Sequence, residues 1–270
     1  LIDSKFSNNS NNSGFHGALC TQGGSVIAKS CYIMQTEISS GSFTGDNISV
    51  YRLGNSRNTV TVRDSVFGAA FNFGGTSYLI NCYSPVTEIG GSMYIKGGTT
   101  VVSGTNSRYE DIIRTFSGGL ALKGGEFGRV GHVWMFANGG SVVIDDGKYF
   151  GSMNFMDTST ASVTVNGGEF YVDDEKDVAL VQYGGTVTIN GGEWYSSSKE
   201  NPNSTSTTKV FQRCLKAAGG KLNITDGVFY GKLHIVGGST IVDGGEFYDT
   251  VWVENENKLI ANLTVNDGIL

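Results

Sequence analysis

Carboxylate side chains recur at one position of a motif that is repeated along the second half of this 270-residue chain. That position is occupied in turn by Glu126, Lys148, Glu169, Glu193, Val228, Glu246 and Ile269. If the copies stack, neighbours in this column lie about 5 Å apart, which suits the two carboxylates of a retaining glycosidase or a bridging Ca²⁺. A catalytic site normally interrupts a repeat instead of recurring in it, so we expect the column to be a solvated outer face.

A second outward column contains most of the tyrosines of this region. Its members are Gly128, Phe150, Tyr171, Tyr195, Tyr230 and Tyr248. Tyrosine rings on a flat sheet can bind sugar rings by face contact or pack against a neighbouring subunit, and they can also simply stack on one another. We therefore predict that a glycan or protein partner contacts Tyr171, Tyr195, Tyr230 and Tyr248.

The other residues with chemical potential are scattered. Short acidic runs occur at Asp145–Asp146 and Asp173–Glu175, and neither has a clear set of partners converging on it. His16, His132 and His234 are far apart along the coil, and the cysteines lack metal-ligand spacing. We predict no catalytic residue, no metal site and no cofactor.

Composition narrows the partners and leaves the cysteines open. The net charge of −6 disfavours nucleic acid, and neither a run of 18 apolar residues nor a signal peptide is present, which predicts no membrane insertion. Cys20 and Cys31 could form a disulfide in an oxidising compartment. Alternatively they are separate thiols, like Cys82 and Cys214.

Both columns depend on a motif that occurs in seven copies. Each copy is a short apolar strand, a polar corner and a glycine, and it ends two residues later at a residue whose side chain we expect to be buried. The copies end at Phe127, Tyr149, Phe170, Trp194, Phe229, Phe247 and Leu270. Strand-like alternation at steps of 18 to 35 residues indicates stacked repeats, and scarce leucine argues against a leucine-rich repeat. We predict an all-β, right-handed parallel β-helix of roughly twelve coils.

The glycine of the motif is present in every copy. Its positions are Gly125, Gly147, Gly168, Gly192, Gly227, Gly245 and Gly268. Because glycine reaches positive φ at no steric cost, we predict a sharp corner at each. A weaker form of the motif, with serine in the glycine column, ends at Phe6, Tyr32 and Phe67, so we assign one coil to each step and place Phe43 in a bulging loop.

The chain is predicted to be one solenoid domain over residues 1–270. Residues 1–115 form irregular coils in this prediction, and residues 116–270 form regular coils with a loop insertion at 196–209. The first and last copies, at Leu1 and Leu270, lack the polar caps that solenoids need. We therefore expect a segment of a longer coil, or a coil whose ends meet like subunits or further coils.

The opening residues resemble a known class of surface proteins. Residues 3–9, with Phe6, followed by Gly17-Ala18 and Gly23-Gly24-Ser25-Val26, resemble the Phe-x-x-Asn and Gly-Gly repeats of polymorphic outer-membrane adhesins. More loosely, the coil is similar to the pectate-lyase-like superfamily, which includes phage tailspikes and carbohydrate-active enzymes. These resemblances imply an exported rod that is exposed at a surface.

Together these observations predict a non-catalytic structural or adhesive module of an extracellular fibre or cell-surface protein. The regular repeat and the lack of a converging acid cluster favour it. The alternative is a polysaccharide-degrading or glycan-binding β-helix of the tailspike or lyase type. Convergent carboxylates near Asp145 or Asp173 would favour that alternative.

Overall fold

The chain folds into stacked parallel strands. The computed structural model describes residues 5–6, 19–85, 93–155, 160–172, 178–195, 213–255 and 260–269. Two compact units are present, Leu1–Gly125 and Glu126–Leu270, and each is a parallel β-solenoid in which the described residues include no helix. The strands make about ten turns, slightly fewer than the roughly twelve coils that the sequence predicted. Turn length varies too much along the chain for sequence spacing to give the number.

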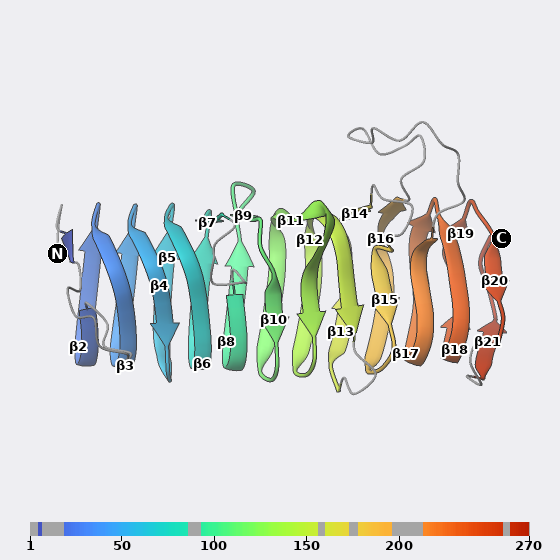
Figure 1. Cartoon of the computed structure of the whole chain (residues 1–270), viewed down its shortest axis with the longest axis horizontal. Helices are drawn as coiled ribbons and strands as arrows, with labels where there is room; N and C mark the ends of the chain where they lie inside the picture. The colour runs from blue at the N-terminus through green and yellow to red at the C-terminus, as the bar shows by residue number, and fades with distance from the viewer. Residues whose placement is uncertain are drawn as a thin grey trace. The chain divides into compact units, whose positions relative to one another are not determined.

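The first unit contains ten strands and the start of an eleventh. In Figure 1 they lie side by side, one turn after another, from the blue to the green part of the chain. They are β1 (Lys5–Phe6), β2 (Leu19–Lys29), β3 (Tyr32–Asp46), β4 (Ser49–Asn55), β5 (Asn58–Arg63), β6 (Val66–Ile80), β7 (Tyr83–Ser84), β8 (Met93–Ser103), β9 (Arg108–Tyr109), β10 (Ile113–Thr115) and the first residues of β11 (Gly119–Ala137).

The first unit has a regular corner that the sequence prediction did not find. Ser30, Asn47, Asp64 and Asn81 follow one another at intervals of 17 residues, and their φ angles are 48, 50, 47 and 51°. Asparagine and aspartate tolerate this left-handed conformation better than other residues with a side chain. The corner is also joined from turn to turn, because Asn81 Nδ2 donates to Asp64 Oδ1 at 3.2 Å. Three successive turns of the first unit therefore have the same length.

Phe43 lies in the core, so its placement in a bulging loop was wrong. Its backbone pairs with Val26 in β2 and with Val60 in β5, and its side chain is 1% exposed. The loop was predicted because Phe43 follows Tyr32 by only 11 residues. Each turn has more than one inward-facing strand, so both residues occur within one turn without competing for one column.

The predicted alignment of Tyr32 with Phe67 is also wrong. Ile33 pairs with Val50 and Val50 pairs with Phe67, so two turns and not one separate Ile33 from Phe67. Tyr32 is 39% exposed. In the turn that contains Phe67, Ser65 was taken as the equivalent of the repeat glycine. The left-handed residue of this corner is Asp64, one position earlier. The shift by one residue moves the side chain to the other face.

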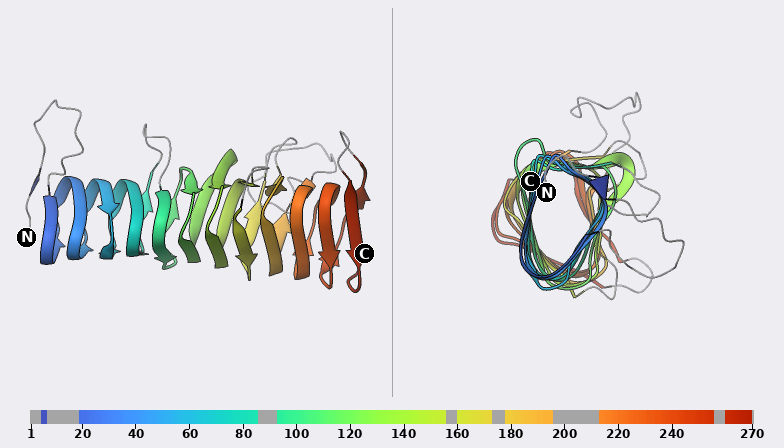
Figure 2. Two further views of the ribbon diagram at one scale, coloured as in Figure 1. Left: turned by 90° about the horizontal axis from the view of Figure 1, so that it is seen from below. Right: turned by 90° about the vertical axis from the view of Figure 1, so that its left-hand side faces the viewer.

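The second unit contains the remainder of β11 and ten further strands. They are β12 (Ser141–Phe155), β13 (Ser162–Val165), β14 (Glu169–Tyr171), β15 (Leu180–Gln182), β16 (Thr186–Tyr195), β17 (Arg213–Phe229), β18 (Lys232–Val242), β19 (Glu246–Phe247), β20 (Val251–Val253) and β21 (Ala261–Val265). The strand pairings between the described residues of this unit are all parallel. Figure 2 shows its turns, green to red, from a second side and end-on.

A column of stacked aromatic rings fills one side of the interior of the second unit. Its members are buried, with at most 6% exposure, and they are Phe127, Tyr149, Phe170, Trp194, Phe229 and Phe247. Neighbouring ring centroids lie 3.9 to 6.0 Å apart and the rings are nearly parallel. Parallel pairing in register brings equivalent side chains of successive turns together, which is why the repeated aromatic produces a stack.

The seven repeated glycines all have positive φ. The angles range from 94° at Gly192 to 134° at Gly147. Where the preceding residue is aspartate, its carboxylate accepts a hydrogen bond from the glycine N–H, as at Asp146, Asp226 and Asp267 (2.8 Å each). The aspartate thus satisfies a backbone donor that the corner leaves outside the strand ladder.

Replacing Phe43 tests its place in the core. Phe43→Ala should lower the free energy of unfolding by about 3–5 kcal/mol, because it opens a cavity beneath two neighbouring strands. Ile27→Ala is the control, since Ile27 is 58% exposed and its loss should change stability by less than about 0.5 kcal/mol. Denaturant unfolding followed by circular dichroism measures both. Equal free energies of unfolding for the two variants would contradict a core position for Phe43.

A pair of glycine variants separates backbone strain from crowding. At Gly168 (φ +105°) an added Cβ would lie 3.0 Å from Gly147 O and from a ring carbon of Tyr149, whereas at Gly124 (φ +119°) it would meet no described atom within 4 Å. Both alanine variants should lose about 1–3 kcal/mol through the unfavourable φ, and Gly168→Ala should lose more. The measurement is again denaturant unfolding. A wild-type midpoint for Gly168→Ala would show that this corner tolerates a side chain.

Candidate functional site

The tyrosines and glutamates predicted to face outward lie side by side on the second unit. Tyr171, Tyr195 and Tyr248 each follow a repeat glutamate by two residues, so both side chains of a pair project from the same face of the strand. The phenol O–H donates to that glutamate in all three cases: Tyr171 to Glu169, Tyr195 to Glu193, and Tyr248 to Glu246 at 2.8 Å. We call the column from Phe150 to Tyr248, with these glutamates, the tyrosine–glutamate face.

Stacking leaves little of this face open to a flat ligand. Tyr171 lies between Phe150 and Tyr195, with centroid separations of 5.4 and 4.9 Å. Tyr230 likewise lies between Tyr195 (5.0 Å) and Tyr248 (5.3 Å). Tyr171 is only 5% exposed, whereas Tyr248 is 66% exposed. The first three tyrosines therefore offer ring edges, and Tyr248 has the largest accessible surface of the four predicted contact residues.

The phenols of this face are held in their protonated form. Desolvation, followed by the hydrogen bond to the neighbouring glutamate, raises the pKa of Tyr171 and of Tyr195 well above the ordinary tyrosine value. For Tyr248 the hydrogen bond to Glu246 is the largest cause of the raised pKa. Ionisation of any of these phenols would set two negative charges against each other.

The carboxylates that suggested glycosidase geometry have other partners. Glu169 pairs in register with Lys148 on one side, where Lys148 Nζ lies 3.6 Å from its carboxylate, and with Glu193 on the other. The ladder thus places two like charges on adjacent strands, which is unfavourable by itself. The hydrogen bonds from Tyr171 and Tyr195 stabilise these charges.

The corner at Asp145 belongs to a ladder of polar side chains. Asn166 Nδ2 donates to Asp145 Oδ1 at 2.8 Å, Asn190 Nδ2 donates to Asn166 Oδ1 at 3.0 Å, and Thr225 Oγ1 donates to Asn190 Oδ1 at 2.9 Å. The acidic run at 145–146 therefore forms part of the corner structure. Residues 173–175 and the insertion at 196–209 lie outside the described residues.

A buried histidine forms a cluster that the sequence did not indicate. Arg213 Nη1 lies 3.1 Å from His234 Nδ1, and His234 Nε2 lies 2.7 Å from Glu254 Oε1. Because arginine can only donate, Nδ1 accepts and the ring proton is on Nε2, where it is donated to Glu254. The ring also stacks on Trp252 at 4.9 Å. The three polar residues come from successive turns, so only the stacking register could have predicted their contact.

The disulfide interpretation is not supported, because Cys31, Cys82 and Cys214 are free thiols. All three are buried, while Cys20 is exposed. Burial raises the pKa of the Cys82 thiol to about 11 and that of Cys214 to about 12, which keeps both protonated at neutral pH. Each of these two thiols donates to a backbone carbonyl group, Cys82 to Ile80 O and Cys214 to Gly231 O.

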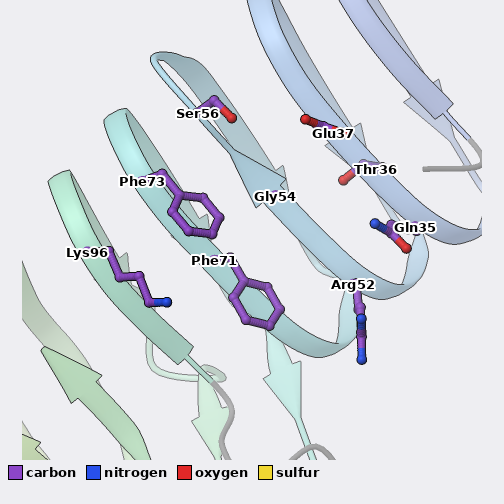
Figure 3. Close-up of a pocket in the computed structure, with 9 residues that line it drawn as sticks. All are labelled: Gln35, Thr36, Glu37, Arg52, Gly54, Ser56, Phe71, Phe73 and Lys96. Carbon is purple, nitrogen blue, oxygen red and sulfur yellow. The ribbon is translucent and has the colours of Figure 1, made fainter. Parts of the chain in front are cut away.

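A groove with an aromatic wall lies on the outer face of the first unit. Its volume is about 280 Å³. Figure 3 shows the nine residues that line it: Gln35, Thr36, Glu37, Arg52, Gly54, Ser56, Phe71, Phe73 and Lys96. They come from β3, β4, β6 and β8 apart from Ser56, which follows β4. The sequence prediction missed the groove because its residues belong to no repeated motif.

Two kinds of feature are absent from the described part of the chain. Within it, no three histidine, cysteine, aspartate or glutamate side chains gather where they could hold a metal ion. Nor does it contain a helix of the length and apolarity that crossing a membrane requires.

A charge-removing substitution tests the coupling between Glu193 and Tyr195. Glu193→Gln should lower the pKa of Tyr195 toward about 10, because the carboxylate charge opposes phenolate formation. A raised folded-state pKa stabilises the protein below about pH 10 and loses that contribution as the pH rises through the folded-state value, so the alkaline loss of stability should shrink in the variant. Phenolate absorbance and denaturant unfolding at increasing pH measure the two effects.

Glu126→Gln is the matched control for this experiment. Glu126 occupies the same column, but Gly128 stands where the next five copies have an aromatic ring. The control should leave the phenolate titration unchanged. A tyrosine titration that is the same in Glu193→Gln as in the wild type would refute the coupling.

Comparisons of the chain with protein-family models, with curated proteins and with solved structures find no match.

Proposed function

We propose that this chain is a non-catalytic structural or adhesive module of an extracellular fibre or cell-surface protein. The observation that carries the proposal is the mutual satisfaction of the outward polar groups in the second unit. Glu169, Glu193 and Glu246 each accept a tyrosine O–H, and the corner amides bond to one another. The corner amides bond across successive turns and so stiffen the coil, whereas each tyrosine bonds to a glutamate of its own strand and leaves that carboxylate engaged.

The last described turn supports assembly with further β-structure. Val253 in β20 pairs with the fully buried Ile235, and Val265 in β21 pairs with the fully buried Val242. Yet Val253 and Val265 are 40 and 41% exposed. Residues at core positions of the register are thus open to solvent. We propose that further parallel β-structure, from like subunits or from further coils of the same chain, covers this apolar face.

The surface location rests on the resemblance of the opening residues to adhesin-type repeats, and it is part of the same proposal. Glycan binding is the second candidate function, and the groove of the first unit favours it. An aromatic wall beside carboxylate, guanidinium and amide groups is the kind of surface that combines apolar contact with directed hydrogen bonds.

Sedimentation velocity of the whole chain tests the proposed assembly. The wild type should form dimers or larger species whose share grows with protein concentration. The double variant Val253→Lys/Val265→Lys should remain monomeric, because two charges on the open face disfavour a stacked strand. Ile27→Lys is the control: it adds a charge at a position that is 58% exposed in the first unit, and it should associate like the wild type.

Two results would contradict the proposal. The first is a wild-type protein that stays monomeric at every concentration, or a double variant that associates as the control does. The second is the release of new sugar ends from a polysaccharide by the wild-type protein, which would show catalysis.

A further inference from the structure

The groove of the first unit is a gap in a ladder of outward side chains. Glu37, Gly54 and Phe71 are paired neighbours on β3, β4 and β6, and Phe71 pairs with Tyr94 on β8. Three of these four positions carry large side chains, and Gly54 carries none. A recess therefore opens above Gly54, with Glu37 on one side and Phe71 on the other (Figure 3).

One wall of the recess is the face of an aromatic ring. The ring centroids of Phe71 and Tyr94 lie 5.0 Å apart and the interplanar angle is 6°. The two ring planes are therefore roughly perpendicular to the direction in which the strands stack. Tyr94 covers the face of Phe71 that is turned toward β8. The opposite face is turned toward the strand of Gly54, a residue with no side chain to cover it, and Phe73, two residues along β6, lies beside the ring with its centroid 6.3 Å away. This is the contrast with Tyr171 and Tyr230, whose two faces are both stacked.

The recess has room for one ring. Glu37 and Phe71 are two strand spacings apart, which is about 10 Å between their backbones. A ring placed at the level of Gly54 would lie about 4.8 Å from the strand on either side, close to the spacing of the existing stack. The volume of about 280 Å³ falls just below the range of pockets for drug-sized ligands, ~300–1,000 Å³.

The polar groups around the recess are mixed in charge. Glu37 presents a carboxylate that accepts hydrogen bonds, while Arg52, which pairs with Gln35, presents a guanidinium that donates them. Ser56 lies on the far side of Gly54 from Arg52, and Lys96 Nζ lies 5.6 Å from the centroid of Phe73 at the rim. A ligand with a net positive charge would face two cations, and one with a negative charge would face Glu37.

We propose that this groove binds one neutral pyranose ring of a glycan. The C–H face of the sugar stacks on the open face of Phe71, and its hydroxyl groups donate to Glu37 and accept from Arg52. A pyranose has both the apolar face and the ring of donor and acceptor hydroxyls that this set of side chains requires. The inference deepens the proposed adhesive function by naming its ligand class, and it concerns only residues of the first unit.

Saturation-transfer NMR titration with the whole chain tests the inference. The probes are the methyl glycosides of glucose, galactose, mannose and N-acetylglucosamine. Methyl glucuronide, glucosamine and adenosine represent anionic, cationic and planar ligands. At least one neutral glycoside should bind at millimolar concentration. Phe71→Leu, which keeps an apolar side chain but removes the aromatic face, should weaken it three- to tenfold. Glu37→Gln should weaken it about tenfold.

Tyr78→Leu is the matched control for Phe71→Leu. Tyr78 is 40% exposed on β6, the strand that carries Phe71, and it does not line the groove. This variant should bind the probe like the wild type, and circular dichroism should show all variants folded. The inference is overturned if no neutral glycoside binds, if Phe71→Leu binds as well as the control, or if a charged ligand or adenosine binds more tightly. If glycoside binding fails in this way while the wild-type protein still self-associates, the pyranose inference is overturned and the proposed structural function is not.

Discussion

Parallel pairing in register is the constraint on which the other features of this protein depend. Each turn sets its residues directly above those of the turn before, at about 4.8 Å, so a residue type repeated in sequence becomes a column in space. The interior column of aromatic rings from Phe127 to Phe247 follows from this rule. So do the outer ladder of tyrosines and the chain of corner amides. The same constraint explains the gap at Gly54, because the glycine occupies a position in the ladder where neighbouring strands carry a large side chain.

The two units meet the same demand for sharp corners with different chemistry. In the second unit glycine takes the positive φ, as at Gly168, and an aspartate before the glycine accepts its N–H in some copies. In the first unit Ser30, Asn47, Asp64 and Asn81 take left-handed conformations with a side chain present. These polar side chains recover part of the conformational cost through hydrogen bonds, of which Asn81 to Asp64 is one. A corner that carries a side chain can thus be joined to the next corner.

The fold class and the second-unit columns could be predicted from the sequence, because the glycine and the aromatic of each copy mark them directly. The first unit was harder. Its corner residues vary in type, as Ser30 and Asn47 show. Because Tyr32 was assigned to the core column, Phe43, only 11 residues later, was placed in a loop. The contact of His234 with Arg213 and Glu254 joins residues about one turn apart with no shared motif. The groove was not predicted for the same reason, because only the strand register shows that Gln35, Gly54 and Phe71 are neighbours.

The corner amide ladder has a direction, and that direction records the order of the turns. Thr225 donates to Asn190, Asn190 donates to Asn166, and Asn166 donates to Asp145, so every donor points toward the earlier turn. An ionised aspartate has no proton to donate, so the relay must stop there. A second relay stops in the same way, with Asn266 donating to Asp243 at 2.6 Å. Aspartate thus ends a chain of hydrogen bonds because it only accepts, and asparagine continues the chain because it both accepts and donates. A slip by one turn would leave an asparagine without its acceptor or place two aspartates side by side, so the ladder also disfavours misaligned turns.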